Sequence, residues 1–399
     1  MLPKSLPRIV QQHADETAIL AIRRAALLTS DEADLSDLAQ LDMVLSANLS
    51  GLALAEDSGW LFAMDALHDD PDPSTVFAPS YLSVLDQRDN RVGAVLEFVA
   101  QDPSLARSVA LAMCFFGRTY AASLTDWYLE QPHETHKLVG LNMCGLLGHY
   151  PKQAIADALT GTTSLHVSAM NLVANAQLTD LLPAMPQPTE ESGPAYHVVH
   201  AATVSLLQKT PTEQLVHIAK SDAPEATLAL TVCGVLMHAA AAETYFGVFP
   251  WEQRAADHQI QLAGFMGDRT MMRWLLEQSA LGANPDLLAQ SFRRMTGRDL
   301  NDLLVGLATP AAPNPFDPEY AGRTEAPDFD QLAASLTAHV SDQFIVLNQS
   351  FNDQTYPGLL QNAPLGDRHM IVLRAQSMFG VSRKYDLDAP AAFQLSAMM

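Results

Sequence analysis

Basic residues are scarce in this chain of 399 residues. Lys and Arg number 23 against 45 Asp and Glu, which gives a formal net charge of −22. Proteins that grip nucleic acid or dock on an anionic membrane leaflet do so with clustered Lys and Arg. The shortage of basic residues therefore argues against nucleic acid and against a membrane surface as partners.

Charged residues of both signs are also few. They make up 17% of the chain, where about 25% is usual, while 48% of the residues are apolar. A chain of this composition buries enough apolar surface to fold, so disorder is excluded for most of its length. We expect a folded protein with a large core.

Long apolar runs and targeting signals are missing. The N-terminal stretch MLPKSLPRIVQQHADE lacks the apolar segment and cleavage site of a secretory signal. The most apolar stretch, residues 226–242, has 17 residues and contains His238, whereas a spanning helix needs about 20 apolar residues. We interpret it as a buried helix, and we expect a cytoplasmic protein without a membrane span.

Motifs for catalysis are missing as well. The chain has no GxSxG elbow, no GxxxxGK[ST] phosphate loop and no GxGxxG after a strand. Paired carboxylates such as Glu56 with Asp57, and Asp69 with Asp70, fall at predicted helix ends and loops, where solvation explains them. We therefore predict a protein that is not an enzyme and that holds no cofactor.

Histidines form two HxxH pairs, His133 with His136 and His197 with His200. Residues three apart share a face of a helix, so each pair offers two metal ligands. The sequence HETH is one residue short of the HExxH of zinc peptidases, and His133 follows a proline at a predicted helix start. We assign neither pair to a metal. His13, beside the first apolar stripe, is predicted to be hydrogen-bonded within the N-terminal helices.

Apolar residues recur at helical spacing, which predicts an all-α fold. Residues 1–70 contain two apolar stripes and a third helix from about Asp57 to Leu67, and we interpret them as an N-terminal helical cap. The second helix begins after Asp34, a favourable N-cap residue. The first stripe consists of Val10, Ala14, Thr17, Ala18, Ala21, Ala25 and Leu28, and the second of Leu38, Leu41, Leu45, Leu49 and Leu52.

The middle of the chain, residues 74–306, repeats a pattern in which a helix rich in small residues is followed by a turn and a second helix. The equivalent positions are 114, 144, 171, 204, 233 and 263, separated by 30, 27, 33, 29 and 30 residues, and Ser291 follows 28 residues later. A period near 30 is typical of an α-solenoid (α-α superhelix), in which each helix pair buries its apolar face against its neighbours. We predict about six or seven such pairs.

The three cysteines, Cys114, Cys144 and Cys233, all fall at the same repeat position. Three cysteines cannot all pair within one chain, and buried thiols behave as small apolar groups. We assign them, together with Gly145 and Gly148 in CGLLG, to close packing of helices rather than to a redox or metal site.

Beyond the repeats, residues 307–327 are rich in proline and are predicted to form a linker. Residues 328–399 are predicted to be mostly helical, with a short strand at 344–347. This C-terminal region either packs on the solenoid or forms a separate module.

Aromatic and Arg side chains on second helices and on one turn are our candidate protein-binding residues, because Trp, Tyr and Arg are enriched in binding hot spots. Second helices commonly line the concave face of a solenoid. The alternative is that a Trp at such a position packs between repeats. The candidates are Trp127 and Tyr128, Phe249 and Trp251 (near Phe246), and Arg273 and Trp274.

Several segments resemble a bacterial family of HEAT-like repeat proteins. They are LPRIVQQHADETAIL and LSDLAQLDMVLSANLSGLALAEDSGW near the start, AQSFRRMTGRDL at the end of the repeats, and LLQNAPLGDRHMIVLRAQSMFG with DAPAAFQ near the C-terminus. Members of this family are often encoded beside type VI secretion genes. The resemblance implies a HEAT-like solenoid and an accessory role.

What the resemblance implies is an adaptor or chaperone for a secreted effector. The alternatives are an immunity protein that neutralises a toxin, and a small-molecule enzyme like the lyases built on HEAT-like repeats. In the first two cases the partner is another protein, namely an effector, a toxin or a secretion component. An acidic chain suits a basic toxin, since opposite charge steers association.

Overall fold

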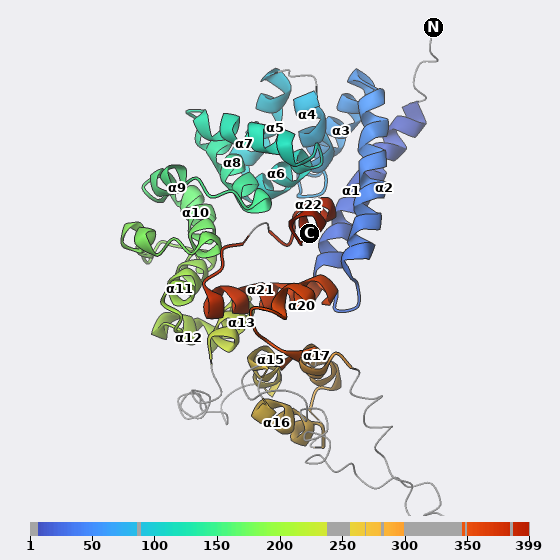
Figure 1. Ribbon diagram of the computed structural model, residues 1–399. Helices are drawn as coiled ribbons and strands as arrows, with labels where there is room; N and C mark the ends of the chain where they lie inside the picture. Colours follow the sequence, from blue (N-terminus) through green and yellow to red (C-terminus); the bar gives the residue numbers. More distant parts are fainter. Residues whose placement is uncertain are drawn as a thin grey trace, which may run out of the picture. The chain divides into compact units, whose positions relative to one another are not determined.

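The computed structural model (Figure 1) describes residues 7–85, 89–237, 256–267, 269–280, 283–298, 345–347, 349–383 and 386–398. Within these ranges the chain is almost entirely helical, and the only strands are β1 (Ile345–Val346) and β2 (Gln349–Ser350). The two strands pair antiparallel, with Ile345 opposite Ser350. The prediction of an all-α fold is therefore confirmed, and the strand expected at 344–347 corresponds to β1.

The chain divides into two compact units. Unit 1 comprises Met1–Thr203, Pro364–His369 and Val381–Met399, and unit 2 comprises Val204–Ala363 and Met370–Gly380. The described part of the predicted C-terminal region, 328–399, thus contributes to both units. The predicted linker, 307–327, lies outside the described residues.

The described elements of unit 1 are α1 (Pro7–Leu28), α2 (Leu35–Leu54), α3 (Asp57–Asp69), α4 (Phe77–Leu85), α5 (Asp89–Gln101), η1 (Pro103–Leu105), α6 (Ala106–Cys114), α7 (Arg118–Glu130), α8 (Glu134–Leu147), α9 (Lys152–Leu159), α10 (Thr163–Ala176), η2 (Thr179–Ala184) and α22 (Ala391–Met398). Those of unit 2 are α12 (Glu213–Ala219), α13 (Ala226–Leu236), α15 (Ala256–Met266), α16 (Arg269–Ala280), α17 (Pro285–Thr296), β1, β2 and α20 (Tyr356–Asn362). Two helices, α11 (Pro194–Gln208) and α21 (Leu365–Phe379), contribute residues to both.

The predicted N-terminal helices are present, and α1 and α2 lie side by side. Asp34 caps α2 as expected: its Oδ1 accepts hydrogen bonds from the backbone N–H groups of Ser36 and Asp37, at 2.7 and 3.1 Å. The Asp37 carboxylate in turn accepts from the Asp34 N–H, which completes a capping box. His13 lies 2.8 Å from the side-chain oxygen of Asn48, so its predicted hydrogen bond is confirmed.

The predicted burial of the first apolar stripe is confirmed only for its N-terminal half. Val10, Ala14 and Thr17 are buried, but Ala25 is exposed and the buried residue near the C-terminal end of α1 is Arg24. Helical spacing fits Arg24 as well as Ala25, and the apolar pattern favoured alanine. Arg24 is buried because a carboxylate and two carbonyl groups lie within reach of its guanidinium, as described below.

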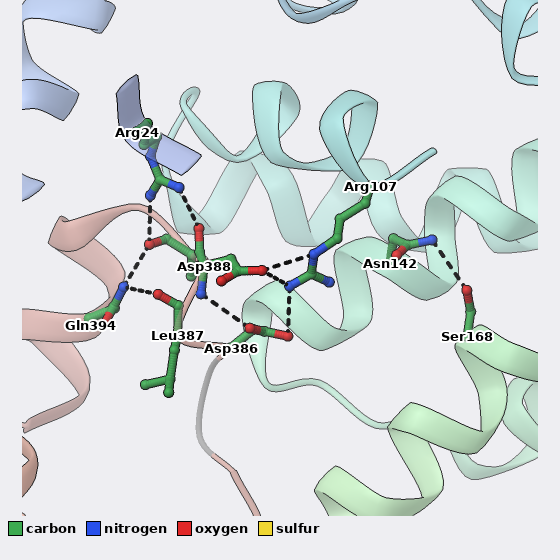
Figure 2. Close-up of polar contacts among 9 residues, drawn as sticks. Arg24, Arg107, Asn142, Ser168, Asp386, Leu387, Asp388 and Gln394 are labelled. Atoms are coloured by element: carbon green, nitrogen blue, oxygen red, sulfur yellow. Dashed lines mark hydrogen bonds and ion pairs between the residues drawn. The ribbon is translucent and has the colours of Figure 1, made fainter. Parts of the chain in front are cut away.

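Six of the helices that carry an equivalent repeat position pack in sequence order, three of them in each unit. In unit 1, α6 packs on α8 and α8 on α10, while in unit 2, α13 packs on α15 and α15 on α17. Polar contacts join neighbours as well: Asn142 of α8 lies 3.4 Å from Ser168 of α10 (Figure 2), and the Ser291 hydroxyl of α17 donates to the Ile260 carbonyl of α15 at 2.9 Å.

Close approach explains the small residues in these helices. A Cβ atom on Gly234 of α13 would lie 2.7 Å from Phe265 of α15, and one on Gly264 would lie 2.6 Å from the Ser291 hydroxyl. Gly145 of α8 is less crowded, because a Cβ atom added there would lie at an ordinary contact distance, 3.5 Å, from Leu172 of α10. Gly148 has a different role from the predicted one, because it ends α8 in the left-handed region, at φ 65°.

All three cysteines are buried. Burial raises the pKa of the Cys114 and Cys144 thiols to about 12. Both thiols are therefore held protonated at neutral pH, in keeping with a packing role.

Among the described residues, no single helix is long and apolar enough to cross a membrane. Helices α2 and α3 are bent by 118° at the break between them, and taken together they reach the length and apolar composition of a membrane-spanning segment.

Candidate functional site: an ionic cluster beside a cavity

The candidate binding residues on α7 have different environments. Tyr128 is fully buried, and its ring packs edge-on against Trp127, with ring centres 4.9 Å apart. Trp127 is 38% exposed and also contacts His136 of α8, with 5.7 Å between ring centres. Tyr128 is thus an interior residue and not a surface contact, because α8 covers its side of α7. Trp127 alone of this pair reaches the surface.

The other candidates are described less fully. Trp274 is half-buried in α16 of unit 2, and Arg273 belongs to the same helix. Phe249 and Trp251, with Phe246, lie outside the described residues. The six candidates are therefore not brought together by the described structure into one surface.

The histidine pairs lie on helices as predicted, with His133 as the N-cap residue of α8. Burial, followed by the charge of its neighbour, lowers the pKa of His136 and likewise of His200. His197 is near the Thr189 carbonyl, at 3.2 Å, while both ring nitrogens of His200 are buried and have no hydrogen-bond partner among the described residues. The described part of the chain contains no group of three or more His, Cys, Asp or Glu able to hold a metal ion.

An ionic cluster that the sequence analysis did not find forms in unit 1 (Figure 2). Its first component is Arg24 of α1, which is 1% exposed. Its Nε donates to Oδ1 of Asp42 of α2 at 2.7 Å. The other two nitrogens donate to the backbone carbonyls of Asp388 and Ala389, at 2.8 and 3.0 Å. Arg24 therefore holds the backbone of the C-terminal segment, residues 386–398, against α1 and α2.

Asp42, the partner of Arg24, also binds the C-terminal segment. Its Oδ2 accepts a hydrogen bond from the backbone N–H of Ala391, at 2.8 Å. The buried pair of Arg24 and Asp42 thus supplies donors to two carbonyl groups and an acceptor to one N–H group. These are the groups that every peptide backbone presents, so the recognition is independent of side chains.

The second component of the cluster is Arg107 of α6. Its Nε donates to Oδ2 of Asp388 at 3.0 Å, and its Nη2 contacts the same oxygen and forms an ion pair with Asp386 at 3.0 Å. Burial by itself would lower the pKa of Arg107, but the charges of Asp386 and Asp388 outweigh it and raise that pKa. Burial would raise the pKa of Asp386, yet Arg107 and Arg383 hold it well below its usual range.

Gln394 of α22 completes the turn that the two arginines hold. Its side-chain nitrogen donates to the carbonyls of Leu387 and Ala389, at 2.7 and 2.8 Å, and its oxygen accepts from Arg368 at 2.5 Å. The segment from Asp386 to Gln394 is consequently fixed by side chains of α1, α2, α6 and α21.

A cavity of about 470 Å³ opens beside this cluster. Its walls come from α1, the loop before α4, and α6 and α8, and Arg24, Arg107 and Asp388 line it together with mostly apolar side chains. A smaller cavity of about 290 Å³ lies between α2 and the segment Pro390–Leu395, with Asp42 in its wall. The Arg24–Asp42 pair therefore has one member in each cavity.

A thiol, guanidinium groups and carboxylates line the two cavities. The thiol that lines the smaller cavity, Cys114, is held protonated by burial, with its pKa at about 12. What the cluster offers is a set of guanidinium donors and carboxylate acceptors beside an apolar wall. Ligand-binding sites commonly combine a few placed polar groups with an apolar wall in this way.

Exposed large apolar side chains gather on the first three helices. Of the eleven that the described residues expose, seven lie on α1, α2 and α3; they are Ile9, Ile19, Ile22, Met43, Val44, Leu54 and Leu61. We call this set the α1–α3 apolar residues. Leu54 is the most exposed, at 85%.

Comparisons of the chain with family models, with curated proteins and with solved structures find no match.

Proposed function

We propose that this chain is a non-catalytic protein-binding scaffold, built as a HEAT-like α-solenoid, that acts as an adaptor or chaperone for an effector of a type VI secretion system. The observation that carries the proposal is the concentration of exposed apolar side chains on α1, α2 and α3. Singly exposed apolar residues are common on any protein, whereas a contiguous apolar patch marks a surface that binds other proteins. Because α1, α2 and α3 pack on one another, we infer that their exposed apolar side chains form such a patch.

The order of helix packing supports the solenoid arrangement. In unit 1, α6 contacts α8 and α8 contacts α10, and in unit 2, α13 contacts α15 and α15 contacts α17. Stacking of this kind follows from the roughly 30-residue sequence period and from close approach at glycines such as Gly264. A stacked array presents long faces, which suits it to holding another protein.

The secretion role rests on the resemblance of the two ends of the chain to the HEAT-like family. One of the resembling segments, DAPAAFQ, includes Asp388, Ala391 and Gln394, which lie in the ionic cluster. The resemblance therefore covers residues that hold the C-terminal segment in place, and not only residues of the repeats.

A second candidate function is that of an immunity protein, and the net charge of −22 favours it. Many toxins that cut nucleic acid are basic, and an acidic partner attracts them and competes with their substrate by charge.

Deletion of the coding sequence in the native host separates the two. For an adaptor or chaperone we expect the level or the delivery of one effector to fall while the host grows normally. For an immunity protein we expect growth inhibition that depends on the presence of a toxin. Unchanged growth together with unchanged delivery of every effector would contradict both.

A further inference from the structure

We propose that the 470 Å³ cavity of unit 1 binds a short peptide segment of a partner protein, with one large apolar side chain inside the cavity and the adjoining backbone held by Arg107 and Asp388. The proposal deepens the proposed function, on which it rests for the source of the peptide. It assigns a binding site and a ligand class to unit 1 alone.

The size and the walls of the cavity suit an apolar side chain. Its volume of about 470 Å³ lies in the range of small-ligand sites, roughly 300 to 1,000 Å³. Leu28 of α1, Phe77 of α4, Leu111 of α6 and Leu146 of α8 contribute to the wall, and Ile22 lies at its edge with 57% of its surface exposed. A leucine or phenylalanine side chain would find apolar contacts from four helices.

The polar end of the cavity offers a ligand one hydrogen-bond donor and one hydrogen-bond acceptor. Arg107 uses Nε and Nη2 for Asp386 and Asp388, while its Nη1 has no partner among the described residues (Figure 2). Asp388 accepts through Oδ2, and its Oδ1 has no partner in the same part of the chain. Both side chains are 41% exposed, so a ligand can reach them.

A peptide matches this end better than a simple ion does. A free anion that approached Arg107 would face the carboxylates of Asp388 and Asp72, which both line the cavity. A free cation would face the guanidinium groups of Arg24 and Arg107. A peptide backbone carries a carbonyl that accepts from Arg107 and an N–H that donates to Asp388, so it satisfies both without bringing an unpaired charge.

The chain already shows this mode of recognition at the neighbouring pair. Arg24 donates to the carbonyls of Asp388 and Ala389, and Asp42 accepts from the N–H of Ala391. Arg107 and Asp388 form a second pair of a guanidinium group and a carboxylate, and their side chains are more exposed than Arg24. We therefore expect the cavity to hold a second backbone segment beside the one that the chain supplies itself.

Photo-crosslinking of the full-length protein tests the proposal. The probe is acetyl-Ala-photoleucine-Ala-amide, whose diazirine marks the residues that surround the apolar side chain. We expect labelling of peptides from α1 and α6, competition by acetyl-Ala-Leu-Ala-amide, and little competition by acetyl-Ala-Ser-Ala-amide or by free leucine. Labelling spread evenly over the α1–α3 apolar residues, or equal competition by free leucine, would overturn the assignment of a peptide site.

A matched pair of variants on one helix locates the site. Ala25 is exposed and lines the cavity, so Ala25→Trp places a large apolar ring there without removing a polar side chain. Ala26 is exposed and is not part of the lining, so Ala26→Trp is the control. We expect labelling to fall at least tenfold in A25W and to stay within twofold in A26W, with both circular dichroism spectra unchanged. Equal labelling in the two variants would overturn the proposal.

The same variants keep this inference separate from the proposed function. Capture of a partner from the native host by wild type and A25W alike would leave the scaffold function standing and remove the cavity from it. Specific labelling of the cavity together with no captured partner would support the peptide site and contradict the scaffold function.

Discussion

Buried arginine side chains fix the C-terminal segment of unit 1. Arg24 contacts a carboxylate and two carbonyl groups while only 1% of its surface is exposed. A buried ion pair contributes little compared with an apolar pair of the same size, but removing one partner is costly because the other charge stays buried. The contribution of Arg24 to stability is therefore best tested through its partner.

Asp42→Asn keeps the size of the side chain and removes the charge that balances Arg24. We expect the free energy of unfolding to fall by about 3 kcal/mol or more, since an uncompensated guanidinium remains inside. Urea unfolding at pH 7 measures this change. Asp180 pairs with Lys152 at an exposed site, so Asp180→Asn is the control and should leave the unfolding midpoint unchanged. Similar losses in the two variants would contradict the account of Arg24.

His200 gives unit 1 a dependence on pH. Burial, and then the charge of His197, lowers the pKa of His200 below its ordinary value of 6.5. As the pH falls through 6.5 the unfolded chain binds a proton that the folded chain does not, so stability falls with pH in this range. Above 6.5 the histidine is neutral in both states and the contribution is fully present.

His200→Leu removes this titration. We expect the decrease in melting temperature between pH 7 and pH 5 to be smaller in H200L than in the wild type. Differential scanning calorimetry at several pH values measures it, and the comparison at pH 8 isolates the effect of the altered packing. Parallel curves for the two proteins from pH 8 to pH 5 would show that His200 does not titrate as described.

At the scale of single elements, close approach between helices decides which positions tolerate a side chain. A Cβ atom on Gly59 of α3 would lie 2.1 Å from the backbone carbonyl oxygen of Leu52 in α2, whereas nothing lies within 4 Å of one on Gly93 of α5. A backbone atom cannot move aside as a flexible side chain can.

Gly59→Ala and Gly93→Ala should consequently have opposite effects. In G59A the junction of α2 and α3 must shift, and we expect a loss of stability of more than about 1 kcal/mol, beyond the gain from helix propensity. In G93A the same replacement inside α5 should stabilise the protein by up to about 1 kcal/mol. Thermal unfolding of both variants checks the sign, and a stabilised G59A would contradict the packing described for α2 and α3.

The predictability of the elements from sequence follows the range of the interactions that form them. The N-cap of Asp34 and the buried Leu38, Leu45, Leu49 and Leu52 depend on neighbours within a few turns, and the sequence predicts them. Arg24 was missed because its partners include the carbonyl of Asp388, 364 residues away. The only local signal was a basic residue at helical spacing within an apolar stripe. Tyr128 was misplaced because periodicity does not show that α8 covers it.

At the scale of the whole molecule, the excess of 45 acidic over 23 basic residues surrounds the chain with a negative field. Such a field speeds the approach of a basic partner and slows that of an acidic one, and salt screens it. The α1–α3 apolar residues would then stabilise the complex once it has formed. Charge and apolar surface thus have separate roles, one in the rate of association and one in the lifetime of the complex.

Affinity capture from the native host, followed by quantitative mass spectrometry, tests the scaffold function most directly. The compared baits are the wild type, a double variant with Ile19→Glu and Leu54→Glu on α1 and α2, and the control Leu85→Glu on α4, which changes an exposed leucine outside the α1–α3 apolar residues. We predict that one effector, toxin or secretion component is enriched by the wild type and by L85E and is lost with the double variant. Recovery of general chaperones alone, or of the same proteins by all three baits, would contradict the account.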